Sequence, residues 1–275
     1  MKAVATFSVL GDMTARIAGS HVQLTTIVGP DADCETYTPT AADARAVADA
    51  QMFVMNDLNP RFEPWAEALL KRAQFRGTKV VATQGVNNIM DDRPLGAVKG
   101  PQIDHHAWHD PSNALVYVAN IGEGMARVDP ANAAFYPTQA DDYAREIRAL
   151  DARAKRELAE VPSAKRRVII SHDVFAYLAR VYDIEMTPAR GLTTDTEPTA
   201  TDVSRLIQQI RMTKIKAIFI ENMEDPRLIE RVAREAGASI GGTLYADALS
   251  KPGGEADTAP PPSPVQIYPN LGEVY

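Results

Sequence analysis

The sequence contains a single cysteine, Cys34, among its 275 residues. One cysteine cannot form a disulfide within the chain, and a zinc site built from several thiolates is excluded as well. Positive charge is also scarce, because 29 Lys and Arg stand against 36 Asp and Glu and leave a formal net charge of -7. Binding to phosphates needs clustered Lys and Arg, so we expect no nucleic acid partner.

Long apolar runs and the common catalytic motifs are missing too. No stretch approaches the ~20 apolar residues needed to span a bilayer. The chain enters a strand-like stretch directly after its first residues, so no signal peptide is apparent. This start fits a cytosolic protein or the mature form of an exported one. No G-x-S-x-G elbow, Walker loop or His-Glu-x-x-His helix is present, which argues against the enzymes built on those motifs.

Short β-branched or apolar runs alternate with helical patterns along most of the chain. Strands are predicted at 3–7, 22–28, 52–55 and 79–82, and again at 167–171, 185–187, 217–220 and 239–243. Helices are predicted at 41–50, 62–76, 203–212 and 226–235. Alternation of this kind is typical of parallel sheets with helices on both faces, so the predicted fold class is α/β.

The alternation stops between about residues 111 and 162. Two helical patterns, 112–128 and 129–160, follow one another here without a strand, and the second carries one apolar stripe. Some twenty helical residues reach about 30 Å, the width of a small domain. Pro137 marks a kink or the true start of this helix. We therefore expect four parts: an N-terminal lobe over 1–128, a linking helix over 129–161, a C-terminal lobe over 162–258 and a Pro-rich tail over 259–275.

Several candidate metal ligands follow predicted strands. Three of the five histidines lie within positions 105–109, among them His106. His172 directly follows one strand, Asp247 follows another, and Glu35 comes after a turn beyond the second strand. Because ligands of open α/β sheets bind beyond the carboxyl ends of the strands, these side chains could converge on one cleft. Imidazole and carboxylate groups suit zinc, manganese or ferrous iron.

Each candidate also has a structural interpretation. A carboxylate after a strand is more often the N-cap of a helix than a ligand, which applies to Asp247 and Glu35 alike. His172 could simply pack or cap at a helix start, and the cluster at 105–109 could be solvated surface. A metal site is favoured only when these residues are considered together, because several of them follow the carboxyl ends of predicted strands.

Five segments carry a resemblance to a known family. They are residues 29–33 with 37–40, 106–111, 171–177, 221–223 with 226–228, and 242–250. In this order they resemble the zinc- and manganese-type substrate-binding proteins of bacterial ABC importers, from residue 3 to about residue 258. The resemblance implies two lobes, each with a parallel four-stranded sheet flanked by helices. One long helix joins the lobes, and a metal cleft lies between them.

The resemblance also implies the ligands of one divalent transition metal: Glu35, His106, His172 and Asp247. Members of the family normally carry a histidine at the position of Glu35. A carboxylate there adds charge and a harder donor, which shifts the preference from zinc toward manganese or ferrous iron. The metal nevertheless stays open between zinc and manganese, with iron possible. In an alternative arrangement Glu35 points away, and three protein ligands and a water hold the ion.

The function implied by the resemblance is that of a periplasmic receptor. It would capture the metal and deliver it, as a monomer, to a cognate ABC permease in the inner membrane. Four protein ligands leave no open position for a substrate, which argues against catalysis. The alternatives are a metal-dependent hydrolase with Glu35 as general base, a non-haem iron enzyme using two histidines and a carboxylate, and an interaction module with incidental histidines.

Overall fold

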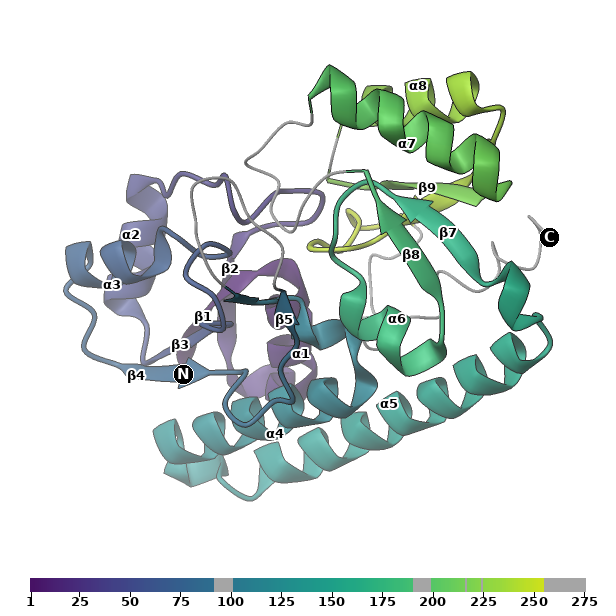
Figure 1. The fold of residues 1–275 in the computed structure, drawn as a ribbon. Helices are drawn as coiled ribbons and strands as arrows, with labels where there is room; N and C mark the ends of the chain where they lie inside the picture. Colours follow the sequence, from purple (N-terminus) through teal and green to yellow (C-terminus); the bar gives the residue numbers. More distant parts are fainter. Residues whose placement is uncertain (92–100, 190–198, 216, 224, 255–275) are drawn as a thin grey trace.

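The computed structural model describes residues 1–91, 101–189, 199–215, 217–223 and 225–254. It shows an α/β protein with two lobes, each built around a parallel four-stranded sheet (Figure 1). This is the fold class that the sequence predicts. The predicted Pro-rich tail, 259–275, lies outside the described residues.

The N-terminal sheet has the strand order β2-β1-β3-β4. Its strands are β1 (Lys2–Phe7), β2 (Gln23–Val28), β3 (Met52–Met55) and β4 (Thr78–Val81). All four residues of β3 are buried, as expected for an inner strand of a parallel sheet covered on both faces. The helices of this lobe are α1 (Ser8–Ala18), α2 (Ala41–Asp49), α3 (Ala66–Arg72) and α4 (Pro111–Val128). Figure 1 shows α2 and α3 on one side of the sheet and α1 and α4 on the other.

The C-terminal sheet repeats this topology. Its strands are β7 (Arg167–Ile170), β8 (Glu185–Pro188), β9 (Ala217–Glu221) and β10 (Ser239–Leu244), in the order β10-β9-β7-β8. In both sheets, therefore, the first strand of the lobe lies between its second and third strands, and the fourth strand lies at the edge next to the third. The helices are α6 (Ala176–Tyr182), α7 (Ala200–Thr213) and α8 (Arg227–Ala236). Val168 and Ile170 belong to one core cluster and Ile169 to a second, so both faces of this sheet are covered.

The helix α5 (Phe135–Ala159) joins the lobes and extends beneath both of them (Figure 1). Tyr136 and Tyr143 near its start belong to the N-terminal core, whereas Ala154 and Leu158 near its end belong to a C-terminal core. A short 3₁₀ helix, η3 (Pro130–Asn132), interrupts the helix predicted at 129–160. Pro137 lies in the first turn of α5, where its missing N–H removes no helical hydrogen bond. Pro137 therefore marks the start of the helix.

Several elements escape the sequence-based prediction. The structure adds α1, α6 and a two-stranded antiparallel pair of β5 (Met90–Asp91) and β6 (Gln102–Ile103). It also adds the 3₁₀ helices η1 (Gly19–His21), η2 (Ala107–His109) and η4 (Ser163–Lys165). The helix predicted at 62–76 is shorter than expected, because α3 covers only Ala66–Arg72.

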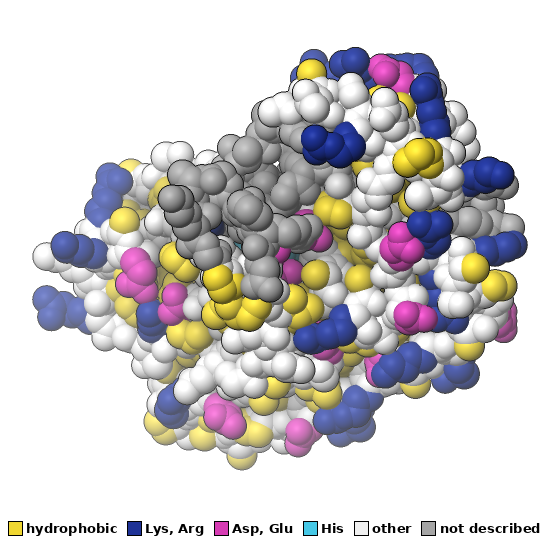
Figure 2. All heavy atoms as spheres, in the orientation of Figure 1, with side chains coloured by type: hydrophobic (Ala, Val, Ile, Leu, Met, Phe, Trp, Pro, Cys, Tyr) yellow, Lys and Arg dark blue, Asp and Glu magenta, His cyan; other side chains and the backbone are white. Residues whose placement is uncertain are grey.

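Among the described residues, no helix has both the length and the apolar character needed to cross a membrane. Over the face in Figure 2, Lys and Arg side chains are interspersed with Asp and Glu, and hydrophobic atoms lie between them. Charge of one sign is therefore not gathered into a single patch on that face.

Candidate metal centre

His106 lies at the start of η2, where a neighbouring carboxylate fixes it. Oδ1 of Asp104 accepts a hydrogen bond of 2.9 Å from the backbone N–H of His106 and lies 2.8 Å from its ring Nδ1. Both side chains are buried. Burial raises the pKa of Asp104 to about 7, although the neighbouring His105 opposes the rise. Burial and the nearby imidazoles of His105 and His172 hold the pKa of His106 well below its usual range, so its ring is neutral.

His172 follows β7 and has a carboxylate partner of the same kind. Oε1 of Glu221, the last residue of β9, accepts a hydrogen bond of 3.1 Å from the backbone N–H of His172. Oε2 of Glu221 lies 2.6 Å from ring Nδ1 of His172. Burial lowers the pKa of His172, but the charge of Glu221 and contacts with Asp247 outweigh it and raise that pKa well above the usual range. Both histidines thus turn Nε2 away from the carboxylate that holds Nδ1.

Asp247 lies between the two rings. Its Oδ1 is 3.5 Å from Nε2 of His106, and its Oδ2 is 3.4 Å from Nε2 of His172. The ligand atoms of these three residues all lie within 4.8 Å of one another, and the three side chains are fully buried. Burial raises the pKa of Asp247, and His172 opposes that rise. Because His106 belongs to the N-terminal lobe and the other two to the C-terminal lobe, the lobes meet at this group.

Glu35 is buried and acts electrostatically on Asp247, but it is not a member of this group. Its backbone N–H donates to Oδ1 of Asp33 at 2.8 Å, which fixes the loop after β2. Its Oε1 lies 3.2 Å from Nε2 of His105. The structure therefore brings His106, His172 and Asp247 together and places Glu35 next to them, against His105.

Some residues of the site were not predicted from the sequence. Asp104 and Glu221 lie against Nδ1 of His106 and of His172, and neither carboxylate was predicted to have a role. The Asp-x-His spacing of Asp104 and His106 is a usable signal, because a carboxylate two residues before a histidine can reach its backbone N–H and Nδ1. The interpretation of the cluster at 105–109 as solvated surface is wrong, since all three of its histidines are buried.

Hydrogen bonds between the lobes close the centre. The hydroxyl of Tyr177, from α6, donates to the carbonyl oxygen of Asp104 at 2.8 Å and accepts from the N–H of Ile89 at 3.0 Å. The indole N–H of Trp108 donates to the carbonyl oxygen of Ala246 at 3.2 Å. These contacts join the segments on either side of His106 to the C-terminal lobe.

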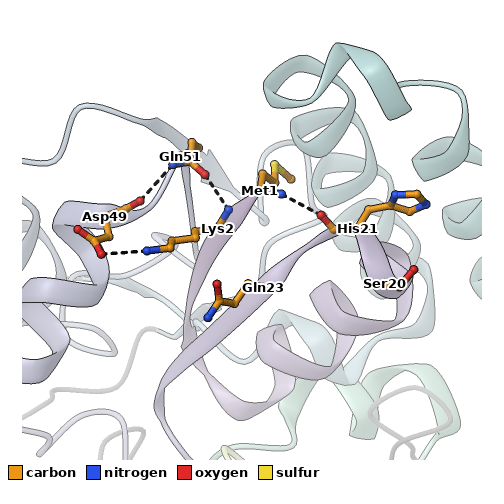
Figure 3. A pocket seen from close by; sticks show the side chains of 7 residues that line it. All are labelled: Met1, Lys2, Ser20, His21, Gln23, Asp49 and Gln51. Carbon is orange, nitrogen blue, oxygen red and sulfur yellow. Dashed lines mark hydrogen bonds and ion pairs between the residues drawn. The ribbon is translucent and has the colours of Figure 1, made fainter.

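A separate hollow of about 600 Å³ lies at the amino ends of β1 and β2, and none of the candidate ligands lines it (Figure 3). Its polar groups bind one another: Nζ of Lys2 lies 3.0 Å from Oδ2 of Asp49, and the backbone N–H of Lys2 donates to Oε1 of Gln51 at 2.7 Å. His21 lies here, and its ring packs against Phe135 with 4.6 Å between the ring centroids. This hollow does not gather ligands for a metal.

The chain is similar to known proteins over nearly its whole length. A family described as zinc-uptake complex component A, periplasmic, matches residues 3–259. The iron-binding protein YfeA of Yersinia pestis is 31% identical over 258 residues, which cover 94% of this chain and 81% of YfeA. The manganese ABC transporter substrate-binding lipoprotein PsaA of Streptococcus pneumoniae is 28% identical over 262 residues, covering 94% of this chain and 84% of PsaA.

A solved structure is similar over the whole chain. The Mn-bound periplasmic metal binding protein from Candidatus Liberibacter asiaticus has a TM-score of 0.83 and 28% sequence identity, covering 100% of this chain and 99% of that one. The family match extends over nearly the whole sequence and includes every residue of the candidate centre. This chain therefore belongs to the family of zinc-uptake complex component A, whose members serve as metal-binding substrate-binding components of ABC transporters.

Proposed function

We propose that this chain captures one divalent transition-metal ion between its lobes and delivers it to the permease of an ABC importer. The observation that carries the proposal is the position of Asp247, whose two oxygens face Nε2 of His106 and Nε2 of His172 inside the protein. Two imidazoles and a carboxylate are suitable donors for zinc, manganese or ferrous iron. Their complete burial favours sequestration of an ion over turnover of a substrate.

Capture requires the donors to be unprotonated. The lowered pKa of His106 leaves its Nε2 available to the ion. His172 gives up a proton when the ion binds, and the carboxylate of Glu221 remains on its Nδ1. We propose Glu35 as the fourth ligand, because it is a buried carboxylate that acts electrostatically on Asp247 and, unlike Asp104 and Glu221, is not positioned on Nδ1 of His106 or His172.

The identity of the metal remains part of the proposal. Relatives of this chain are named as iron-binding and as manganese transporter proteins. Two carboxylates make the donor set harder than one with three imidazoles, which favours manganese or ferrous iron. Zinc also accepts carboxylate ligands and binds more tightly than manganese at equal supply.

Delivery requires the lobes to loosen around the ion. A single helix, α5, is built into the cores of both lobes, so we propose release by small local shifts instead of a wide hinge motion. The functional parts in this proposal are the lobes at 1–128 and 162–258 and the linker at 129–161. We further propose that the protein works as a monomer in the periplasm and meets its permease at the inner membrane.

A metal-dependent hydrolase and a non-haem iron enzyme are both disfavoured. The family is that of a transport component, and Glu35 faces His105 instead of an open position beside the three donors. An interaction module with incidental histidines is also disfavoured, since such a module would not place a buried carboxylate on Nδ1 of each metal-facing ring.

Metal content is the direct test. Protein prepared without added metal and then titrated with Mn²⁺ or Zn²⁺ should bind one equivalent by elemental analysis. His106→Ala and His172→Ala should each abolish stoichiometric binding while circular dichroism stays unchanged. His21→Ala, in the separate hollow, is the matched control and should bind as the unmodified protein does. Full binding by both site variants would rule out the proposed function.

A further inference from the structure

His105 is held as firmly as the residues of the metal centre, although it is not one of the three grouped donors. Its side chain is fully buried. Its ring stacks on Phe62 with 4.7 Å between centroids and lies 3.9 Å from the ring of His106. Its carbonyl oxygen accepts a hydrogen bond of 2.9 Å from Nδ2 of Asn56, whose Oδ1 is in turn bound by the hydroxyl of Tyr117 at 2.6 Å. Backbone and ring are thus both fixed in place.

The ring nitrogens of His105, unlike its carbonyl oxygen, lack hydrogen bonds to the other described residues. Within the part of the chain that the structure describes, neither Nδ1 nor Nε2 makes a hydrogen bond. A buried polar group without a hydrogen bond is costly, and such a group in a folded protein calls for an explanation such as an ion. Nε2 lies 3.2 Å from Oε1 of Glu35, but without the geometry of a hydrogen bond.

The spacing of that contact is typical of two donors on one cation. With metal–ligand bonds of about 2.1 Å, neighbouring donors lie about 3.0 Å apart at right angles and about 3.4 Å apart in a tetrahedron. The Nε2 atoms of His106 and His172 lie 3.5 and 3.4 Å from the oxygens of Asp247. The 3.2 Å between His105 and Glu35 falls in the same range.

We propose that His105 is an additional ligand of the cargo metal, acting through Nε2 together with the carboxylate of Glu35. The centre then offers three imidazoles and two carboxylates. This inference rests on the proposed function and deepens it. The ring contact between His105 and His106 joins the pair to the three-residue group, and both Glu35 and His105 lie close enough to Asp247 to act on its carboxylate electrostatically.

Coordination by five donors affects which metal ion the centre prefers. Zinc in closed protein sites is almost always four-coordinate, whereas manganese and ferrous iron accept more ligands and harder ones. His105 would therefore favour manganese or ferrous iron over zinc in this chain. His105 is in this sense a specificity-determining residue.

The number of bound imidazoles can be measured without any variant. The wild-type protein is labelled with ¹⁵N at its five histidines, loaded with Mn²⁺ and studied by pulsed electron paramagnetic resonance. We expect coupling to three imidazole nitrogens, falling to two in His105→Phe. Phenylalanine keeps a flat ring on Phe62 and removes both nitrogens. We also expect His105→Phe to lower Mn²⁺ affinity at least about tenfold, and His109→Phe, which replaces another buried histidine of the segment, to lower it much less.

The outcomes separate this inference from the proposed function. Two coupled imidazoles in the wild-type protein, together with unchanged Mn²⁺ affinity in His105→Phe, would overturn the role of His105 and leave the proposed function standing. Stoichiometric binding of Zn²⁺ without binding of Mn²⁺ would overturn it as well. Failure of the wild-type protein to bind either ion would instead contradict the proposed function.

Discussion

Nδ1 of His172 lies 2.6 Å from Oε2 of Glu221, and both side chains are fully buried. The same relationship joins His106 to Asp104 in the other lobe, at 2.8 Å. In each pair the carboxylate also accepts the backbone N–H of its histidine. Such a carboxylate fixes the ring orientation and the tautomer, so that Nε2 is presented to the ion.

Replacement of Glu221 by glutamine should weaken metal binding about 10- to 100-fold. The amide keeps the shape of the carboxylate but removes the charge that supports the bound imidazole of His172. Competition against a chelator of known affinity measures the change. Glu185→Gln is the control, because that exposed glutamate of the same lobe pairs with Arg167 and should leave affinity unchanged. Equal affinities of the two variants would contradict the role of Glu221.

Metal affinity should fall as the pH is lowered through the pKa of His172. Burial lowers this pKa, but Glu221 and Asp247 together raise it above the usual range, so the apo protein retains a proton that the ion must displace. Above that pKa the proton is already absent and affinity should level off. Calorimetric titration at several pH values, in buffers of different ionisation enthalpy, measures both affinity and released protons.

The Glu221→Gln variant provides a check on the pH dependence. Loss of the carboxylate charge lowers the pKa of His172, so the fall in affinity should begin at a lower pH than in the wild-type protein. An affinity that is independent of pH in both proteins would show that His172 loses no proton on binding.

Replacement of Glu35 by histidine should shift selectivity toward zinc. An imidazole is a softer donor than a carboxylate and removes one negative charge from the buried site. We expect the ratio of Zn²⁺ to Mn²⁺ affinity to rise about tenfold or more, measured by competition between the two ions. Glu67→His, on the exposed surface of α3, is the control. If the ratio stayed constant in Glu35→His, Glu35 would not be a ligand.

Replacement of Tyr177 by phenylalanine should speed metal release. The hydroxyl of Tyr177 bonds to Asp104 and Ile89 across the two lobes, and its loss leaves these backbone groups unsatisfied at a cost of about 1 to 3 kcal/mol. Stopped-flow transfer of the ion to a chelator measures the release rate.

Tyr182→Phe is the matched control for this experiment. The hydroxyl of Tyr182 donates to Oδ1 of Asp151 on α5 at 3.0 Å. A similar loss of stability without faster release is expected there. Equal release rates in the two variants would contradict a role of Tyr177 in holding the lobes closed.

Replacement of Asp12 by asparagine should stabilise the fold at neutral pH. Burial raises the pKa of Asp12 to about 6, although Arg16 opposes the rise. Because this folded-state pKa lies above the unfolded value, Asp12 destabilises the protein increasingly as the pH rises toward 6. Asp12→Asn should therefore gain about 1 to 3 kcal/mol at pH 8 and much less at pH 4, measured by urea unfolding of the apo protein. The exposed Asp141→Asn should show no such pH-dependent gain.

The strands of both large sheets were predictable because buried parallel strands leave runs of apolar residues in the sequence. The helix α1 was missed because it begins at Ser8, directly after β1 ends at Phe7, without a turn to mark it. Gly11 within it also lowers the helical signal. A Cβ atom at Gly11 would clash with Oγ1 of Thr26, so glycine permits the close packing of α1 against β2.

The candidate centre was predictable only in part, because some of its residues are positioned by contacts between segments that are distant in the sequence. His172 and Asp247 follow strands, and their position follows from the topology of a parallel sheet. The burial of the cluster at 105–109 depends on contacts with the other lobe, such as the hydrogen bond from Trp108 to Ala246. Contacts between residues so distant in the sequence leave no local pattern. The contact of His105 with Glu35 is of the same kind.

The division of the donors between the lobes has a mechanical consequence. An ion held as proposed, by His106 on one side and by His172 and Asp247 on the other, would act as a reversible cross-link between the cores of the two lobes. A metal ion that binds the folded protein but not the unfolded chain stabilises the folded state by mass action. Calorimetric melting should therefore show the loaded protein unfolding in one cooperative step, while the bare protein can melt lobe by lobe.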